Sequence, residues 1–103
     1  MLYEFNQETS QEIMDILATN LKKRRLEKGY TRAYLAEASG VPAPTIARFE
    51  QQHAISLESF VKLAQALGYN DSLKALLSEP RYSTISELDT IRRNKSRQRG
   101  TTK

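Results

Sequence analysis

The chain has no cysteine, no tryptophan and only one histidine among its 103 residues. The lack of cysteine excludes disulfides and thiolate metal sites and is compatible with a reducing compartment. A single histidine, His53, excludes a histidine cluster around a metal. No apolar run has the length of a membrane-spanning helix, and Met1–Ser10 has neither the basic start nor the apolar stretch of a signal peptide. We therefore expect no membrane segment, no metal and no cofactor.

Features of catalytic sites are also scarce. The sequence has four glycines, none of them in a phosphate-cradling loop, and no paired acids that suggest a cleft. The hydrophobic fraction of 39% is sufficient for one modest core but too small for a deep substrate cleft. These observations predict a single domain without enzymatic activity.

Positive charge is concentrated near the C-terminal end. The formal net charge is +4, yet residues 1–30 and residues 31–78 are each neutral. Residues 79–103 hold seven basic and three acidic side chains, so they carry the whole excess. The basic tail contains Arg92, Arg93, Lys95, Arg97 and Arg99. We expect it to bind nucleic acid or an acidic protein surface, or to remain a solvated end without a partner.

Apolar spacing and capping residues predict an all-α fold of five short helices over residues 11–78. The first is expected over roughly 11–28, where Ile13, Leu17 and Leu21 recur at helical spacing. Thr9 or Ser10 is expected to cap this helix, and Gly29 is expected to stop it. Polar caps and glycine or proline stops separate the other helices: Thr31, Gly40, Pro42, Pro44, Ser56, Gly68, Asn70, Asp71 and Pro80. Residues 1–10 form an N-terminal arm, residues 79–91 an irregular or strand-like segment, and residues 92–103 a disordered tail in this prediction. Within residues 79–91, Tyr82, Ile85 and Leu88 fit either a short strand or a helical turn capped by Ser86.

The residues from Leu21 to Gly68 carry a recognisable pattern. They include LKKRRLEKGYTRAYLAEASGVPAPTIARFEQ, followed by SLESFVKLAQALG. A small residue, Ala36, and a turn glycine, Gly40, suit two helices that meet at a steep angle. This segment resembles the helix-turn-helix domain of the Xre family, the phage Cro and repressor type. The resemblance implies a compact fold like that of lambda repressor and a dimeric, sequence-specific DNA-binding regulator in the bacterial cytoplasm, associated with the nucleoid.

The family places the second helix of the motif in the major groove. Carried over position by position, the residues implied to face the bases are Ala43, Pro44, Thr45 and Arg48. An arginine there can bond guanine O6 and N7, whereas alanine and proline offer only apolar contact. We therefore expect recognition of DNA shape to contribute more to specificity. The same resemblance implies phosphate contacts by Arg32, Gln51, Gln52 and His53. Gln52 departs from the usual glycine of the family, which puts the geometry of that turn in question.

Two further roles follow from the resemblance. Arg25 and Glu50 match a pair that relatives join in a largely buried salt bridge; the alternative is two exposed charges on separate faces. Leu73, Leu76 and Leu77 match a last helix that often forms the dimer interface; the alternative is that they close the core. Leu2, Tyr3 and Phe5 give the N-terminal arm an apolar character that suggests docking on the domain or on a partner.

The layout of this domain, a short C-terminal segment and an arginine-rich tail also resembles HipB-type antitoxins. That resemblance implies an autorepressor of a toxin–antitoxin operon, which binds double-stranded operator DNA and holds a HipA-like serine/threonine kinase toxin. An alternative reading is an adaptor protein or antitoxin that mainly binds a partner protein. An Arg48→Ala substitution separates the two, because it should abolish DNA readout and spare an adaptor role.

Overall fold

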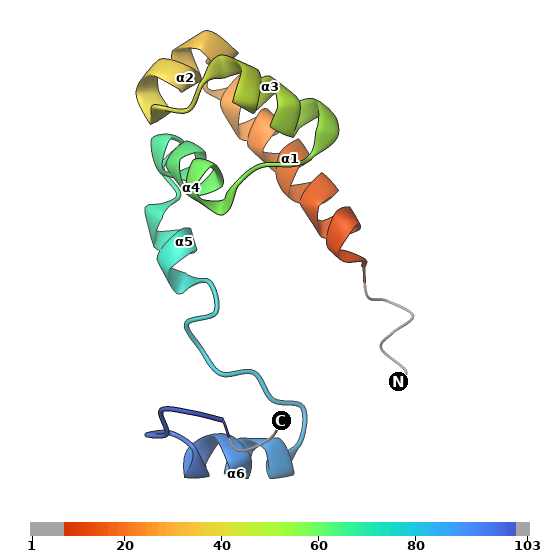
Figure 1. The fold of residues 1–103 in the computed structure, drawn as a ribbon, viewed down its shortest axis with the longest axis vertical. Coiled ribbons are helices and arrows are strands. Elements are labelled where there is room, and N and C mark those ends of the chain that lie inside the picture. Colours follow the sequence, from red (N-terminus) through yellow and green to blue (C-terminus); the bar gives the residue numbers. More distant parts are fainter. Residues whose placement is uncertain (1–7, 101–103) are drawn as a thin grey trace. The chain divides into compact units, whose positions relative to one another are not determined.

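The computed structural model describes residues 8–100, and the N-terminal arm around Leu2, Tyr3 and Phe5 therefore lies outside the described residues. Within residues 8–100 the chain forms six helices and no strand. In order they are α1 (Ser10–Glu27), α2 (Arg32–Ser39), α3 (Ala43–Gln52), α4 (Leu57–Ala66), α5 (Asn70–Ala75) and α6 (Ile85–Arg93) (Figure 1). The chain divides into two units, Met1–Leu73 and Lys74–Lys103. The first unit contains α1 to α4 and the start of α5.

The structure confirms the all-α prediction and corrects two details of it. The helix count is six, because residues 85–93 form α6 where an irregular or strand-like segment was expected. The cap of α6 is Thr84, whose hydroxyl accepts a hydrogen bond from the backbone N–H of Glu87 at 3.0 Å. Of the two alternatives for Tyr82, Ile85 and Leu88, a short strand and a helical turn, the structure has the helix, and its cap is Thr84 where Ser86 was expected. α6 also includes Arg92 and Arg93, the first two residues of the segment expected to be disordered.

Local hydrogen bonds define the helix ends in the first unit. Thr9 and Glu12 form a capping box at the start of α1, with reciprocal backbone–side-chain bonds of 3.1 and 2.7 Å. Thr31 caps α2 and Ser56 caps α4 through their hydroxyls. Gly40 ends α2 with a φ of 79°, a left-handed conformation that a side chain disfavours. Its N–H donates to the carbonyl of Ala36 at 2.8 Å.

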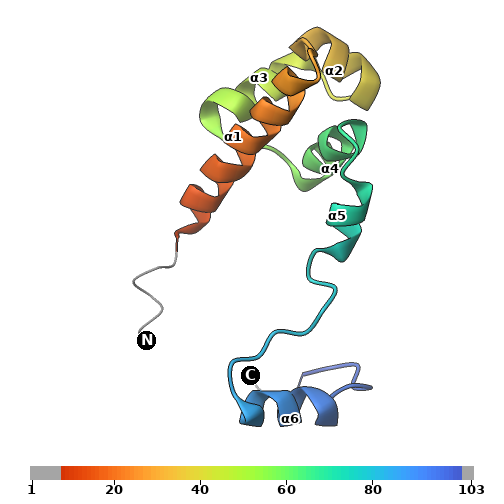
Figure 2. The same cartoon turned by 180° about the vertical axis from the view of Figure 1, so that it is seen from behind.

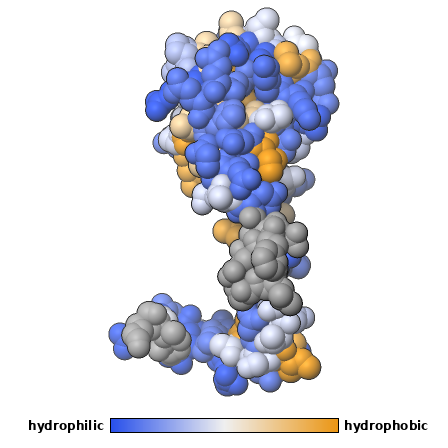
Figure 3. All heavy atoms as spheres, turned by 90° about the vertical axis from the view of Figure 1, so that its right-hand side faces the viewer, coloured by the Kyte–Doolittle hydropathy of each residue, from blue (hydrophilic) through white to orange (hydrophobic). Residues whose placement is uncertain are grey.

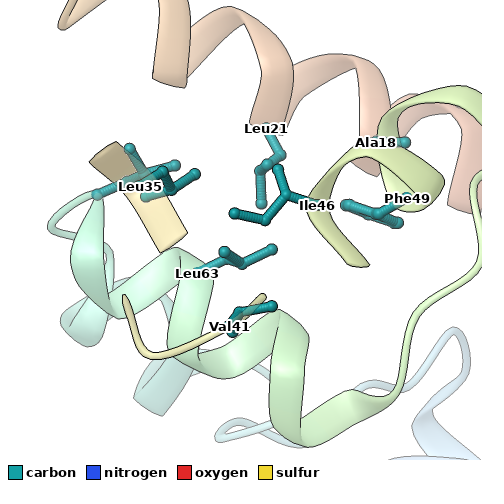
Figure 4. Close-up of a cluster of buried hydrophobic side chains, with 8 residues drawn as sticks. Ala18, Leu21, Leu35, Val41, Ile46, Phe49 and Leu63 are labelled. Carbon is teal, nitrogen blue, oxygen red and sulfur yellow. The ribbon is translucent and has the colours of Figure 1, made fainter. Parts of the chain in front are cut away.

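The core of the first unit lies where α1, α2, α3 and α4 converge. α3 packs against α1 and α2, and α4 packs against α2 (Figure 2). The buried side chains are Ala18, Leu21, Leu35, Val41, Ile46, Phe49, Leu63, Ala64 and Leu67. Figure 4 shows several of these side chains directed toward one another, including Val41 from the turn between α2 and α3. The Phe49 ring meets the Phe60 ring edge-on, with centroids 5.8 Å apart.

Several leucine and isoleucine side chains expected on apolar faces are exposed. On α1 the buried positions are Ala18, Leu21 and Arg25, whereas Ile13 and Leu17 are 48% and 40% exposed. Leu57, at the first position of α4, is also largely exposed, whereas Leu63 and Ala64 are the buried residues of that helix. The face of the first unit seen in Figure 3 is mostly hydrophilic with small apolar areas. In the described part of the chain no helix is long and apolar enough to cross a membrane.

Candidate nucleic-acid interface

The turn between α2 and α3 sets the direction of α3. Gly40 reverses the backbone, the Val41 side chain is buried, and the Pro42 carbonyl accepts the first helical hydrogen bonds of α3 from Thr45 and Ile46. Pro42 has no N–H to leave unpaired in this turn, which is why proline is tolerated here. Burial of one residue in the turn fixes how α3 sits on α2, as in a helix-turn-helix.

α3 has a buried face and an exposed face. Ile46, Phe49 and Glu50 are buried against the other helices. The four residues expected to face the bases lie elsewhere on α3: Pro44 and Arg48 are exposed, and Ala43 and Thr45 are half-buried. Because Pro44 and Arg48 are four positions apart, they share one side of the helix. The helix therefore presents one cation and one apolar ring on its outer side.

A hollow lies between α3 and the start of α4. Thr45 and Arg48 line it from α3, and Ser56 and Ser59 line it from the N-terminal turn of α4, with Ala54 and Ile55 between them. Hydroxyl groups and an arginine are the side chains that contact the edges of bases and the phosphates of DNA. The sequence reading did not assign a binding role to Ser56 or Ser59, although the N-cap signal at Ser56 placed it at a helix start.

The structure brings Arg25 and Glu50 together in a buried ion pair. The Arg25 side chain is 7% exposed and that of Glu50 is 0% exposed. Arg25 donates from Nε to Glu50 Oε2 at 2.7 Å and from Nη2 to Glu50 Oε1 at 2.9 Å. Its third nitrogen, Nη1, donates to the Tyr30 carbonyl at 2.8 Å. The pair thus joins α1, α3 and the turn that follows α1.

Arg32, expected at a phosphate, also bonds Glu50. Its Nε donates to Glu50 Oε1 at 3.0 Å, and its side chain is 34% exposed. Burial raises the pKa of Glu50, but the hydrogen bonds and charges of Arg25 and Arg32 outweigh burial and hold that pKa below its ordinary value. Glu50 is therefore ionised at neutral pH and shared by two arginines. The sequence reading recognised only one of these two contacts.

The residues at the end of α3 have different environments. Gln51 and Gln52 are exposed, as a role at the DNA backbone requires. His53 follows them with a φ of 63°, and its Nδ1 lies 2.5 Å from Oδ1 of Asp15 on α1. An ionised carboxylate only accepts hydrogen bonds, so Nδ1 of His53 is the donor. A hydrogen bond from Gln11 and then the contact with His53 lower the pKa of Asp15.

The remaining predicted residues lie near or beyond the end of α5. Leu73 is half-buried, whereas Leu76 and Leu77 follow the last residue of α5 and are 69% and 96% exposed. Leu76 and Leu77 therefore do not close the core, and they are not on α5 as expected. All five basic tail residues from Arg92 to Arg99 are exposed. Within residues 8–100, no group of three acidic, histidine or cysteine side chains is placed to hold a metal ion.

Comparison with known proteins agrees with this geometry. A helix-turn-helix family model matches residues 21–73, just over half of the chain and the part that contains α2, the turn and α3. Neither the curated proteins nor the solved structures contain a match. The matched segment includes the buried pair, the turn at Gly40 and the exposed side of α3. The chain therefore belongs to this helix-turn-helix family, of the Cro and C1 repressor type, and is a DNA-binding transcriptional regulator.

Proposed function

We propose that this regulator binds an operator near its own gene, as a dimer, and represses its own transcription. The observation that carries the proposal is the position of Arg48: it is exposed on the outer side of α3 and lines the hollow with Thr45. A helix of this width enters the major groove, where arginine bonds guanine O6 and N7. We assign base readout to Arg48 and Thr45, with apolar contacts from Ala43 and Pro44 and a contribution from DNA shape.

Phosphate contacts complete this proposed interface. Gln51 and Gln52 are exposed at the end of α3, and Arg32 is half-exposed at the first position of α2. Such contacts set the register of a protein on the duplex without reading its sequence. His53 has one ring nitrogen occupied by Asp15, which leaves Nε2 as its atom for DNA.

Dimer formation is supported by the leucines after α5. Leu76 and Leu77 are exposed, and large apolar side chains at that position are typical of a surface that a partner covers. A two-fold dimer doubles the number of bases read, which a single short recognition helix needs for specificity. We assign Leu73, Leu76 and Leu77 to this dimer or partner surface.

The wider setting that we propose is a HipB-type antitoxin in a toxin–antitoxin operon. The regulator would then be a non-enzymatic protein of the bacterial cytoplasm and nucleoid, and it would hold a HipA-like serine/threonine kinase. The layout supports this: a helix-turn-helix domain precedes α6 and a basic tail. Coexpression with a kinase encoded beside its gene provides the test. A stable complex in size-exclusion chromatography supports the setting, and two separate peaks contradict it.

A second function, that of an adaptor which mainly holds a partner protein, is favoured by one observation. Two of the four residues expected at the bases, Ala43 and Pro44, have no hydrogen-bonding side chain. Direct readout by such a helix is sparse. In this reading, the basic tail and the apolar N-terminal arm with Leu2, Tyr3 and Phe5 are the parts that bind the partner.

DNA binding by purified protein distinguishes these functions. Fluorescence anisotropy would compare the DNA upstream of its own gene with a scrambled fragment, at two salt concentrations. The Arg48→Ala variant should lose preference for the upstream DNA, and Lys23→Ala, which removes an exposed cation from α1, is the matched control. Equal, strongly salt-dependent binding to both fragments would instead assign binding to the basic tail. No binding to either fragment would support the adaptor function.

A further inference from the structure

Glu50 bonds two arginines that use their nitrogens differently. Arg25 has all three of its side-chain nitrogens bonded within the protein, two to Glu50 and one to the Tyr30 carbonyl. Arg32 donates to Glu50 only through Nε, and its two Nη atoms have no partner among the described residues. The exposed fractions of the two side chains are consistent with this difference, at 7% for Arg25 and 34% for Arg32. Arg25 therefore has a structural role. Arg32 is fixed at Nε by Glu50, and its two Nη atoms remain available for another partner.

The charge of this cluster is not balanced. Two guanidinium groups surround one carboxylate, and the bidentate pairing with Arg25 already neutralises Glu50. The excess positive charge therefore belongs to Arg32, at the first position of α2. The N-terminal turn of a helix adds a partial positive charge of its own. An anion placed there would meet both.

We infer that Glu50 is a positioning residue for DNA binding, and that it directs the Nη side of Arg32 toward a phosphate of the DNA backbone. The first helix of a helix-turn-helix crosses the backbone, which puts the start of α2 beside phosphates. Two adjacent N–H groups on one guanidinium match two phosphate oxygens. Because Nε is already bonded, Arg32 loses less rotamer freedom when DNA binds.

This arrangement ties the backbone contact to the recognition helix. Glu50 belongs to α3, so the carboxylate that orients Arg32 is rigidly connected to Arg48, which lies half a turn away on the same helix. A shift of α3 would move the anchor of Arg32 as well. The register set at the phosphate and the readout by α3 are therefore mechanically coupled. The inference rests on DNA binding through α3.

Variants at Arg32 test the inference while leaving Glu50 and Arg25 in place. Binding to the DNA upstream of the gene would be measured by fluorescence anisotropy over a salt series. These measurements would be made at a temperature at which circular dichroism shows that every variant is folded. Arg32→Ala should weaken binding about tenfold and reduce the slope of log K against log salt by about one. Arg32→Lys keeps the charge but has one nitrogen for two partners, so it should recover less than half of the lost affinity in log units.

The control removes a comparable arginine elsewhere. Arg24 on α1 is 41% exposed and pairs with Glu27 at 2.8 Å, so Arg24→Ala deletes one paired, half-exposed cation. Its affinity should stay within about twofold of wild type. Equal loss in Arg24→Ala and Arg32→Ala would assign the effect to net charge and overturn the inference. Full recovery of affinity in Arg32→Lys would overturn it too, because a point charge would then suffice.

A double-mutant cycle tests Glu50 itself. Glu50→Gln should weaken DNA binding in the wild-type background and have little further effect when Arg32 is already alanine. Additive losses in this cycle would show that Glu50 and Arg32 act separately, against the inference. If Glu50→Gln does not fold, the Arg32→Lys result decides. Wild-type protein that fails to bind any DNA would instead refute the proposed function, and that outcome is distinct from the others.

Discussion

Removing Arg25 should destabilise the first unit strongly. In Arg25→Ala, Glu50 keeps only the 3.0 Å bond from Arg32, and the Tyr30 carbonyl loses its partner. Breaking a buried ion pair by deleting one member costs about 3–5 kcal/mol. Because Arg32 still offsets part of the buried charge, we expect the lower end, about 3 kcal/mol. For a domain of this size, each kcal/mol lowers the Tm by about 4–8 °C, so the expected fall is about 12–24 °C.

Thermal unfolding followed by circular dichroism measures this fall. Lys22→Ala, which shortens an exposed side chain on the same helix, is the matched control and should change stability by less than about 0.5 kcal/mol. A Tm of Arg25→Ala within about 2 °C of wild type would refute the reasoning. That result would mean that water or Arg32 compensates the buried carboxylate fully.

Four other predictions follow from the same structure. The pKa of Glu50 is lower in the folded protein than in the unfolded chain, so its ionised form stabilises the fold above about pH 4.5. This contribution is lost as the pH falls through the folded-state pKa, and a Tm that is constant from neutral pH to pH 3 would contradict the prediction. Gly40→Ala should cost about 1–2 kcal/mol, measured by urea denaturation, because φ is 79° and no atom crowds the added Cβ. Ile46→Ala, which empties a fully buried position, should cost about 2–5 kcal/mol in the same assay, whereas a cost below about 1 kcal/mol would contradict its place in the core. Truncation at Asp89 should flatten the salt dependence of DNA binding if the basic tail lies on phosphates, and leave it unchanged if the tail binds protein or nothing.

The helix ends were predictable because their signals are local. Thr9, Thr31 and Ser56 each bond a backbone N–H three residues later. Gly29 and Gly40 take the left-handed conformation where a helix was expected to stop. Such signals involve only neighbouring residues, so they can be read without knowing the rest of the fold. After α5 the sequence offered a helical turn only as an alternative to a strand and placed its cap at Ser86, whereas the helix is capped by Thr84 and runs to Arg93.

The exposure of apolar side chains could not be predicted in the same way. Helical spacing puts Ile13, Leu17 and Leu21 on related positions, but only Leu21 is buried. Periodicity predicts which residues share a face of the helix. Whether each of them is buried depends on how much of that face the neighbouring helices cover. Leu76 and Leu77 show a second limit. Their spacing from Leu73 grouped all three leucines on one helix, but α5 ends at Ala75, so helical spacing does not describe the positions of Leu76 and Leu77.

The amino-acid order alone determined the all-α class, the caps and stops of α1, α2 and α4, and the helix-turn-helix pattern at Gly40, whereas the end of α3 at His53 was not predicted. These features depend on contacts within about one helical turn. The tertiary structure decided the contacts that the resemblance did not imply: Glu50 with Arg32 across 18 positions, and His53 with Asp15 across 38. Each of these contacts needs two helices packed at a particular angle, and that angle is set by the shared core and by no single segment.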